Sequence, residues 1–162
     1  MSEAAQFVVS AVVIGIGATI AMDLWAVVLQ LVLRIPPSNW GMVGRWVGHF
    51  PKGQFVHSSI AQAAPIRGEL AIGWIFHYLT GITYGVLMLA IWGLDWARQP
   101  TLAPALVLSL AALVAPFFLL QPGMGLGVAG SKTPNPTATR VRSVLNHIVF
   151  GLGLYVTAVL MA

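Results

Sequence analysis

The sequence predicts an all-α integral membrane protein, with four transmembrane helices in a bundle that forms a single domain over residues 1–162. Three observations predict it: the composition, four long apolar runs, and basic residues gathered between the runs. Hydrophobic residues make up 58% of the chain and charged residues 7%, whereas an ordinary soluble domain has about 25% charged residues. A soluble core cannot use so much apolar surface without exposing large patches. The chain has no cysteine, which excludes disulfides, thiolate nucleophiles and cysteine-based metal sites.

The first apolar run covers residues 7–33 and predicts a tilted spanning helix. At about 1.5 Å per residue, it exceeds a hydrocarbon core of roughly 30 Å. Arg34 marks its end, and Pro36-Pro37 cannot continue it. Three further spans are expected at about residues 65–92, 101–121 and 140–161, with Pro65 in the first turn of the second span and a kink at Pro116 in the third.

The connector at residues 34–64 is too long to be structureless in a compact protein. Aromatic and apolar residues recur at three-to-four spacing from Trp40 to Phe50, directly after the capping residues Ser38-Asn39. This pattern predicts a short amphipathic helix in the membrane interface between spans one and two, where tryptophan is favoured. A second short helical piece is expected at residues 55–64.

The basic residues predict the topology. Seven of the eight Lys and Arg residues lie in or beside the two longer connectors, which the positive-inside rule places in the cytoplasm. We therefore expect a multi-pass protein of the bacterial inner membrane with both termini in the periplasm. The first run is too long for a signal-peptide core, and basic residues that follow topology do not indicate a nucleic-acid partner. The seven are Arg34, Arg45, Lys52, Arg67, Lys132, Arg140 and Arg142.

Two matching stretches suggest a binding site. His77 to Gly81 in the second span and His147 to Gly151 in the fourth each place a histidine four residues before a glycine. Residues four apart share one face of a helix, so each imidazole is expected beside a notch with no side chain. Asp23 is the only acid inside a span. A central aspartate costs about 2.5–3.5 kcal/mol on insertion scales, so it should face the bundle and find a partner there.

The strongly polar intramembrane residues gather in the cytoplasmic half, which predicts a cytoplasm-facing polar pocket for a small polar ligand, a proton or a metal ion, linked to transport. His49 and His57 in the connector are each expected as polar residues at the level of the lipid headgroups. Alternatively, together with Arg45, Arg67 and Glu69 they could form a lid over the pocket, and the Gly/Pro-rich residues 122–136 are expected to form its gate. The G-x-G-x-x-G pattern at residues 125–130 has no βαβ unit around it, so a dinucleotide site is disfavoured. The predicted ligand-binding residues are Asp23, His77, His147, Glu69, Arg67, Arg45, Asn146, Gln121 and Lys132.

Several alternatives stay open at this point. His77, His147 and Asp23 form a competent ligand set for a transition metal. Haem b held by the two histidines is less favoured, because a bis-histidine haem site needs few other polar groups. The polar cluster could equally serve only to hold the helices together through hydrogen bonds.

Three classes of function therefore compete. Besides the ligand-binding protein, the chain could be a membrane enzyme acting on a lipid or amphiphile, with His77 or His147 as general base and arginines holding an anionic headgroup. It could also be a structural or accessory subunit. Basic residues attract anionic lipid headgroups in all three cases. Four helices rarely suffice for transport, so a homo-oligomer or a larger membrane complex is expected.

A series of ordered polar and glycine motifs carries a family resemblance over nearly the whole chain. With these residues the chain resembles a bacterial membrane-protein family catalogued as domain of unknown function 2938. The resemblance implies a small multi-helix membrane protein and brings no activity, substrate or catalytic residue. The motifs are Val43-Gly44-Arg45-Trp46, His49, Gly53, His57, Glu69, Gly73-Trp74, His77-Tyr78, Gly81, Gly123-Met124-Gly125, Lys132 to Pro136, Arg140 and His147 to Tyr155.

Overall fold

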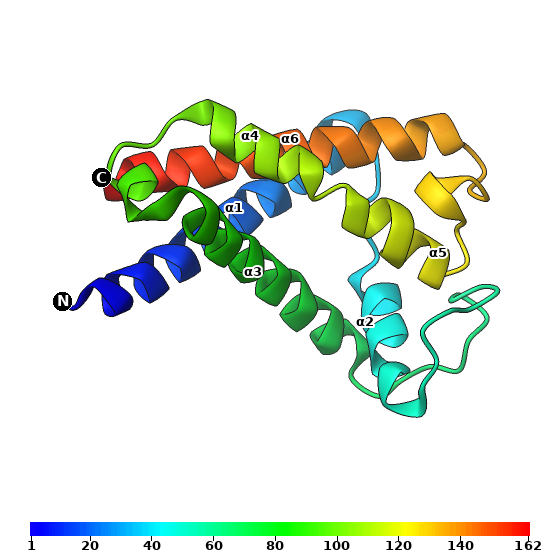
Figure 1. Ribbon diagram of the computed structural model, residues 1–162. Helices are drawn as coiled ribbons and strands as arrows, with labels where there is room; N and C mark the ends of the chain where they lie inside the picture. Colours follow the sequence, from blue (N-terminus) through cyan, green and yellow to red (C-terminus); the bar gives the residue numbers. More distant parts are fainter. The chain divides into compact units, whose positions relative to one another are not determined.

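The computed structural model describes residues 1–162, and its regular structure is entirely helical. Four helices are long and apolar enough to cross a membrane, which confirms the predicted fold class (Figure 1). They are α1 (Glu3–Leu33), α3 (Glu69–Arg98), the run Leu102–Gly123 and α6 (Pro136–Met161). The third run consists of α4 (Leu102–Ala111), the π-helical stretch η2 (Pro116–Leu120) and α5 (Gln121–Gly123). Short elements are α2 (Trp40–Gly48) and the 3₁₀ turns η1 (Phe50–Lys52) and η3 (Val128–Gly130).

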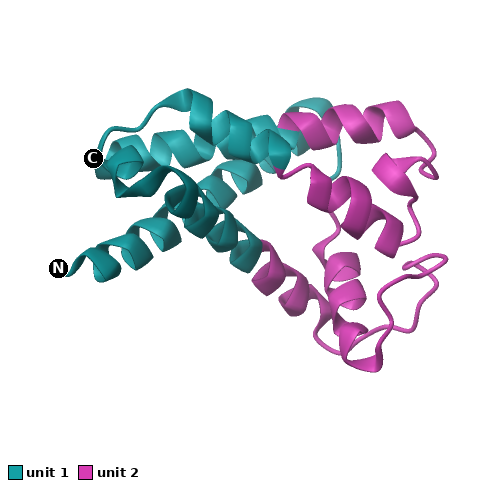
Figure 2. Cartoon of the chain, in the orientation of Figure 1, with its two compact units in different colours: residues 1–37, 78–111, 146–162 teal, residues 38–77, 112–145 magenta.

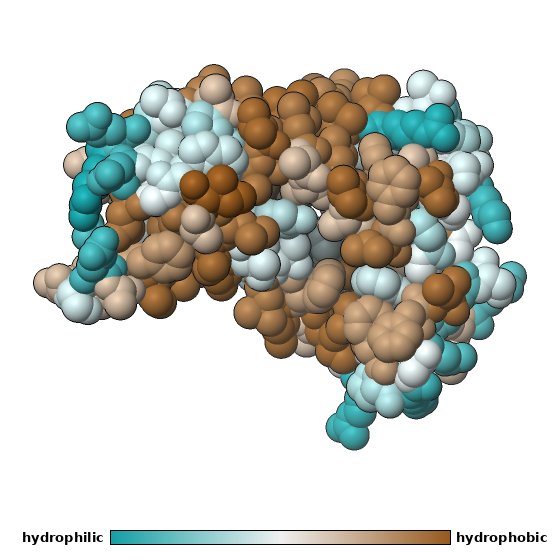
Figure 3. Space-filling view, viewed as in Figure 1, coloured by the Kyte–Doolittle hydropathy of each residue, from teal (hydrophilic) through white to brown (hydrophobic).

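Apolar side chains cover most of the face seen in Figure 3. Many large hydrophobic residues on the long helices are exposed, including Leu31 at 67%, Ile91 at 60% and Leu119 at 64%. Surfaces of this kind are liabilities in water but suit contact with lipid chains.

The chain forms two compact units, which are described separately (Figure 2). Unit 1 contains residues 1–37, 78–111 and 146–162, and unit 2 contains residues 38–77 and 112–145. The single-domain expectation for residues 1–162 stays a prediction.

Unit 1 is a bundle of segments from α1, α3, α4 and α6. Its core combines large apolar side chains with alanines at the places where the helices come closest. The fully buried members include Ile14, Met88, Leu154, Ala11, Ala18, Ala105 and Ala158. Small residues let helix backbones approach closely, which is how helices associate when lipid supplies no hydrophobic drive. A Cβ atom at Gly15 would lie 2.5 Å from the carbonyl oxygen of Gly81, so α1 and α3 meet there backbone to backbone.

Unit 2 is built around α2 and the two longer connectors. The side-chain oxygen of Asn39 accepts a hydrogen bond from the Met42 N–H at 3.1 Å, so the predicted cap of α2 is confirmed. Val43, Trp46, Ile60 and Met124 form the buried core of this unit. Aromatic and apolar residues of α2 thus pack against both connectors.

Four boundaries differ from the sequence expectations. The second long helix begins at Glu69 and not at Pro65, because Gly68 adopts a left-handed φ of 77° directly before it. Residues 55–64 form turns and no helix, since their N–H groups bond to the other connector: His57 N–H to Gly123 O at 2.8 Å and Ile60 N–H to Met124 O at 3.0 Å.

The other two differences concern helix ends. Helix α3 continues to Arg98 instead of ending near Trp92, with a break at Gly93 where φ is 76°. Helix α6 starts at Pro136, four residues before the expected position, because Asn135 caps it by accepting from Ala138 N–H at 3.0 Å. The expected irregularity at Pro116 is present as the start of the π-helical stretch, which follows from the missing proline N–H.

Candidate functional site

Asp23 lies on α1 within unit 1, ten residues before the helix ends at Leu33. The Tyr78 hydroxyl, at the first position of α3 that belongs to this unit, donates a hydrogen bond to Asp23 Oδ2 at 2.9 Å. A hydroxyl donor stabilises the carboxylate without neutralising its charge. From the sequence, His77 and His147 were the expected partners of this acid, and Tyr78 was not among them.

His77 lies on α3 within unit 2 and is 7% exposed. Its ring stacks on the indole of Trp40, with centroids 3.9 Å apart and planes inclined by 24°. Trp74 lies on the same helix with its ring centroid 5.8 Å from that of His77. The imidazole is therefore packed against aromatic rings, and the indole of Trp40 at the start of α2 stacks on it.

Arg45 and Glu69 form a bidentate ion pair within unit 2. Arg45 Nε and Nη2 each donate to a Glu69 carboxylate oxygen at 2.8 Å. The Glu69 carboxylate holds the pKa of the Arg45 guanidinium above its usual value through this hydrogen bond. Arg45 Nη1 also faces the carbonyl oxygens of Ile60, Ala61 and Ala63 at 3.2–3.4 Å.

This pairing changes the role expected for both residues. Glu69 Oε2 also accepts from the Ile66 N–H at 3.1 Å, so the carboxylate closes the last turn before α3 while Arg45 fastens the connector to α2. Bidentate arginine–carboxylate pairs are specific in geometry as well as strong. Arg45 and Glu69 thus act first as a clip that shapes unit 2.

The two predicted glycine notches are filled by neighbouring helices, which corrects the sequence argument. A Cβ atom at Gly81 would collide with the Thr19 hydroxyl and lie 3.0 Å from Gly15 O, both on α1. A Cβ atom at Gly151 would collide with the Ser109 hydroxyl and lie 3.1 Å from Ala105 O on α4. The missing side chains therefore admit helix backbones and not a ligand.

The remaining predicted residues fall into two groups. Gln121 is buried, with its Nε2 3.4 Å from Ser143 Oγ, whereas Asn146 and His147 are half-buried on α6. Arg67 and Lys132 are exposed on the connectors of unit 2. Within neither unit do three or more His, Asp or Glu side chains gather to hold a metal ion. Asp23 and His147 belong to unit 1 and His77 to unit 2, so the predicted metal set gains no support here and stays a prediction.

The contact between His49 and His57 was not predicted from the sequence. His49 ends α2, His57 lies in the following connector, and their ring centroids are 4.9 Å apart with planes inclined by 49°. His49 is 3% exposed. The available signal was two histidines eight residues apart, which the sequence placed separately at the level of lipid headgroups.

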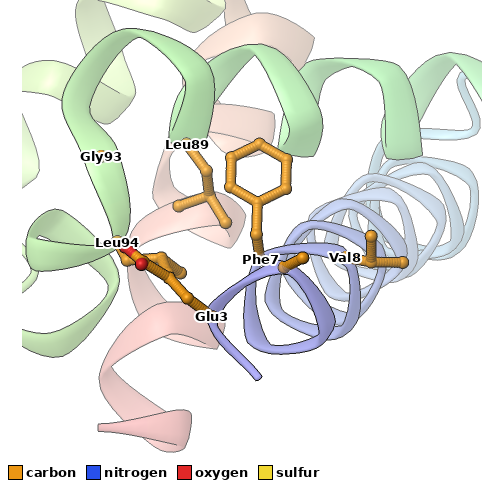
Figure 4. A pocket seen from close by; sticks show the side chains of 7 residues that line it. Glu3, Phe7, Val8, Leu89, Gly93 and Leu94 are labelled. Atoms are coloured by element: carbon orange, nitrogen blue, oxygen red, sulfur yellow. The ribbon is translucent and has the colours of Figure 1, made fainter. Parts of the chain in front are cut away.

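An open groove of about 500 Å³ lies in unit 1 between the start of α1 and the break in α3 at Gly93 (Figure 4). Phe7, Val8, Leu89 and Leu94 line it, with Glu3 as its charged residue. None of the predicted ligand-binding residues lines this groove, and the predicted topology places it toward the periplasm.

The helices and the polar residues between them define the class of the molecule: an all-α membrane protein with four spanning helices and a connector-built unit rich in histidine and aromatic residues. Residues 12–161 match the family described as "Protein of unknown function (DUF2938)", and the chain belongs to that family. The expected family resemblance is thereby confirmed. No curated protein and no solved structure matches the chain.

Proposed function

We propose that this chain is a bacterial inner-membrane protein whose cytoplasmic half binds a small polar ligand, a proton or a metal ion in a transport-linked role. The observation that carries the proposal is Asp23, an acid within a spanning helix. Acids at such depth are costly and mark ion or proton pathways in membrane proteins. Tyr78 donates a hydrogen bond to this carboxylate at 2.9 Å, and a carboxylate is a chemically suitable group for a cationic ligand.

The arrangement of each unit supports the proposed orientation. Both longer connectors belong to unit 2, whereas both termini and the short turn after Arg98 belong to unit 1. The exposed Arg67 and Lys132 of unit 2 suit contact with anionic lipid headgroups. His77 and His147 remain the predicted histidine ligands, and a homo-oligomer or a larger membrane complex remains the proposed assembly, since four helices rarely suffice for transport.

The test compares Asp23→Asn with Tyr78→Phe in protein purified into lipid nanodiscs. Melting temperature and bound metal are measured from pH 5.5 to pH 8, with and without Zn²⁺, Mn²⁺ or Ni²⁺, and an absorption spectrum is recorded for haem. A ligand that binds the folded state raises its stability. We expect this rise to be smaller in Asp23→Asn than in Tyr78→Phe, which keeps the carboxylate, and smaller in both than in wild type. If wild type and Asp23→Asn respond identically to every probe, the proposal is wrong.

A second candidate function is a structural or accessory subunit, favoured by the filled glycine notches. Backbone approach at Gly15, Gly85 and Gly153 shows that much of unit 1 is devoted to tight helix packing. In that case Asp23→Asn should lower the melting temperature by the same amount at every pH and with every metal. A Soret band, or bound metal that is lost in Asp23→Asn, would argue against this candidate.

A further inference from the structure

The connector-built unit 2 holds a second cluster of imidazoles outside the site proposed above. His49 is the C-terminal cap of α2, and backbone bonds fix its neighbour: His57 N–H donates to Gly123 O at 2.8 Å. Trp46 Nε1 donates to Phe55 O at 2.8 Å, which ties the connector to α2 shortly before His57 in the sequence. These hydrogen bonds hold the connector against α2 and so bring the two imidazole rings together.

Three of the four ring nitrogens in this pair lie buried without a hydrogen-bond partner. They are Nδ1 of His49 and both Nδ1 and Nε2 of His57. Buried polar atoms are nearly always paired in folded proteins, and an orphan group commonly marks a place for a water or an ion. The two imidazoles are in contact, and one of them is 3% exposed. Together they indicate an ion site more strongly than a single ring would, since each neutral ring offers a nitrogen lone pair to a cation.

The spacing of the rings suits one shared cation. Imidazole nitrogen binds zinc at about 2.0–2.1 Å, and two rings on one tetrahedral ion therefore have centres roughly 5 Å apart. The observed separation of the centroids is 4.9 Å. The planes are inclined by 49°, which is neither the offset-stacked nor the edge-to-face arrangement that aromatic packing favours.

The charges around the pair do not oppose a cation. Glu69 lies close enough to His49 to interact with it electrostatically, and its charge is balanced by Arg45 in the bidentate pair. Lys52 follows in η1, and its side chain is exposed.

We infer that His49 and His57 form a binding site for a divalent transition-metal ion of the kind that imidazole prefers, such as Zn²⁺, Ni²⁺ or Cu²⁺. Two protein ligands leave coordination positions for water or for an external ligand, so the ion exchanges readily instead of acting as a structural zinc. The inference is independent of the proposed function, because it uses none of Asp23, His77 and His147.

The experiment compares two double variants of the full-length protein in detergent: His49→Gln/His57→Gln and His77→Gln/His147→Gln. Each is equilibrated with Zn²⁺ at pH 7.5, and bound metal is measured after gel filtration. Co²⁺ is then added to record the absorption bands of a metal held by nitrogen ligands. We expect the first variant to bind one Zn²⁺ per chain less than wild type, whatever the second variant binds. Glutamine keeps the size and polarity of the position, and circular dichroism verifies the fold.

Other outcomes separate this inference from the proposed function. Metal binding that persists in His49→Gln/His57→Gln and disappears in His77→Gln/His147→Gln overturns the inference and supports the predicted intramembrane site. Absence of metal binding in wild type overturns it as well. If the first variant fails to fold, the single variant Lys52→Gln and the single variant His57→Gln are compared, and equal Zn²⁺ affinity in these two also contradicts it.

Discussion

Unit 1 and unit 2 are built on different physical principles, although both contain parts of the spanning helices. In unit 1, apolar side chains form the core and small residues let the helices touch, so that the backbones of α1 and α3 meet at Gly15, Gly81 and Gly85. Unit 2 packs through aromatic rings and charged pairs, with Trp46 in its core and the Arg45–Glu69 clip beside it. The comparison teaches that one helix, α3, can pack by close approach of backbones in unit 1 and by a ring stack and an ion pair in unit 2.

The two His-x-x-x-Gly stretches sharpen this lesson. In both, the glycine admits a neighbouring helix, α1 at Gly81 and α4 at Gly151. The histidines differ: His77 is buried and stacked on Trp40 in unit 2, whereas His147 is half-buried in unit 1. Identical spacing therefore predicts similar packing of the glycines and says little about the role of the imidazoles.

The largest effect is expected from bulk added between helices of unit 1. A Cβ atom at Gly85 already collides with Ala11 O of α1, and Gly85→Leu should lower the free energy of unfolding by more than about 3 kcal/mol, because backbones cannot give way as side chains can. Ala90→Leu is the matched control on the exposed face of α3 and should change stability little. Chemical denaturation in detergent measures both, and equal losses would contradict the packing of unit 1.

A smaller effect is expected from the charged clip of unit 2. Glu69→Gln removes the ion pair but keeps the shape, and should lower the melting temperature by a few degrees, because Arg45 is left with carbonyl partners alone. Hydrogen exchange should rise over residues 60–66 at the same time. Asp95→Asn is the control, since the Asp95–Arg98 pair is exposed at 93% and 53% and such pairs contribute little. Equal responses of the two variants would show that the clip has no special role.

The smallest effect is expected at the cap of α2. Asn39→Ala removes the acceptor of the Met42 N–H bond and should cost about 1 kcal/mol. Asn39→Asp, which retains a capping oxygen, should stay close to wild type. Equilibrium unfolding followed by tryptophan fluorescence reports on this region, because Trp40 and Trp46 lie on α2. A loss in Asn39→Asp as large as in Asn39→Ala would speak against capping as the cause.

Local chemistry explains which parts of the fold could be predicted. The end of α1 at Arg34, the cap at Asn39 and the break at Pro116 depend on neighbours in sequence, and they were predictable for that reason. The turns at residues 55–64 were not, because their hydrogen bonds go to residues 123–124, far away in sequence.

The candidate site was predictable in its residue types and less so in its pairings. Asp23, His77 and Glu69 were singled out as polar residues in apolar surroundings. Their partners Tyr78, Trp40 and Arg45 depend on which faces of the helices meet. The contact of His49 with His57 arises in the same way, from a connector folded back on α2.

The sequence by itself determined the four spanning helices, because apolar length and the cost of burying charge in lipid are properties of each segment alone. Only the tertiary structure decided that the glycines admit helices instead of ligands and that Arg45 and Glu69 form an ion pair. It also decided that the rings of His49 and His57 lie in contact. The physical reason is that a contact between distant residues depends on which surfaces the fold presses together, and spacing along one helix carries no information about the surface opposite.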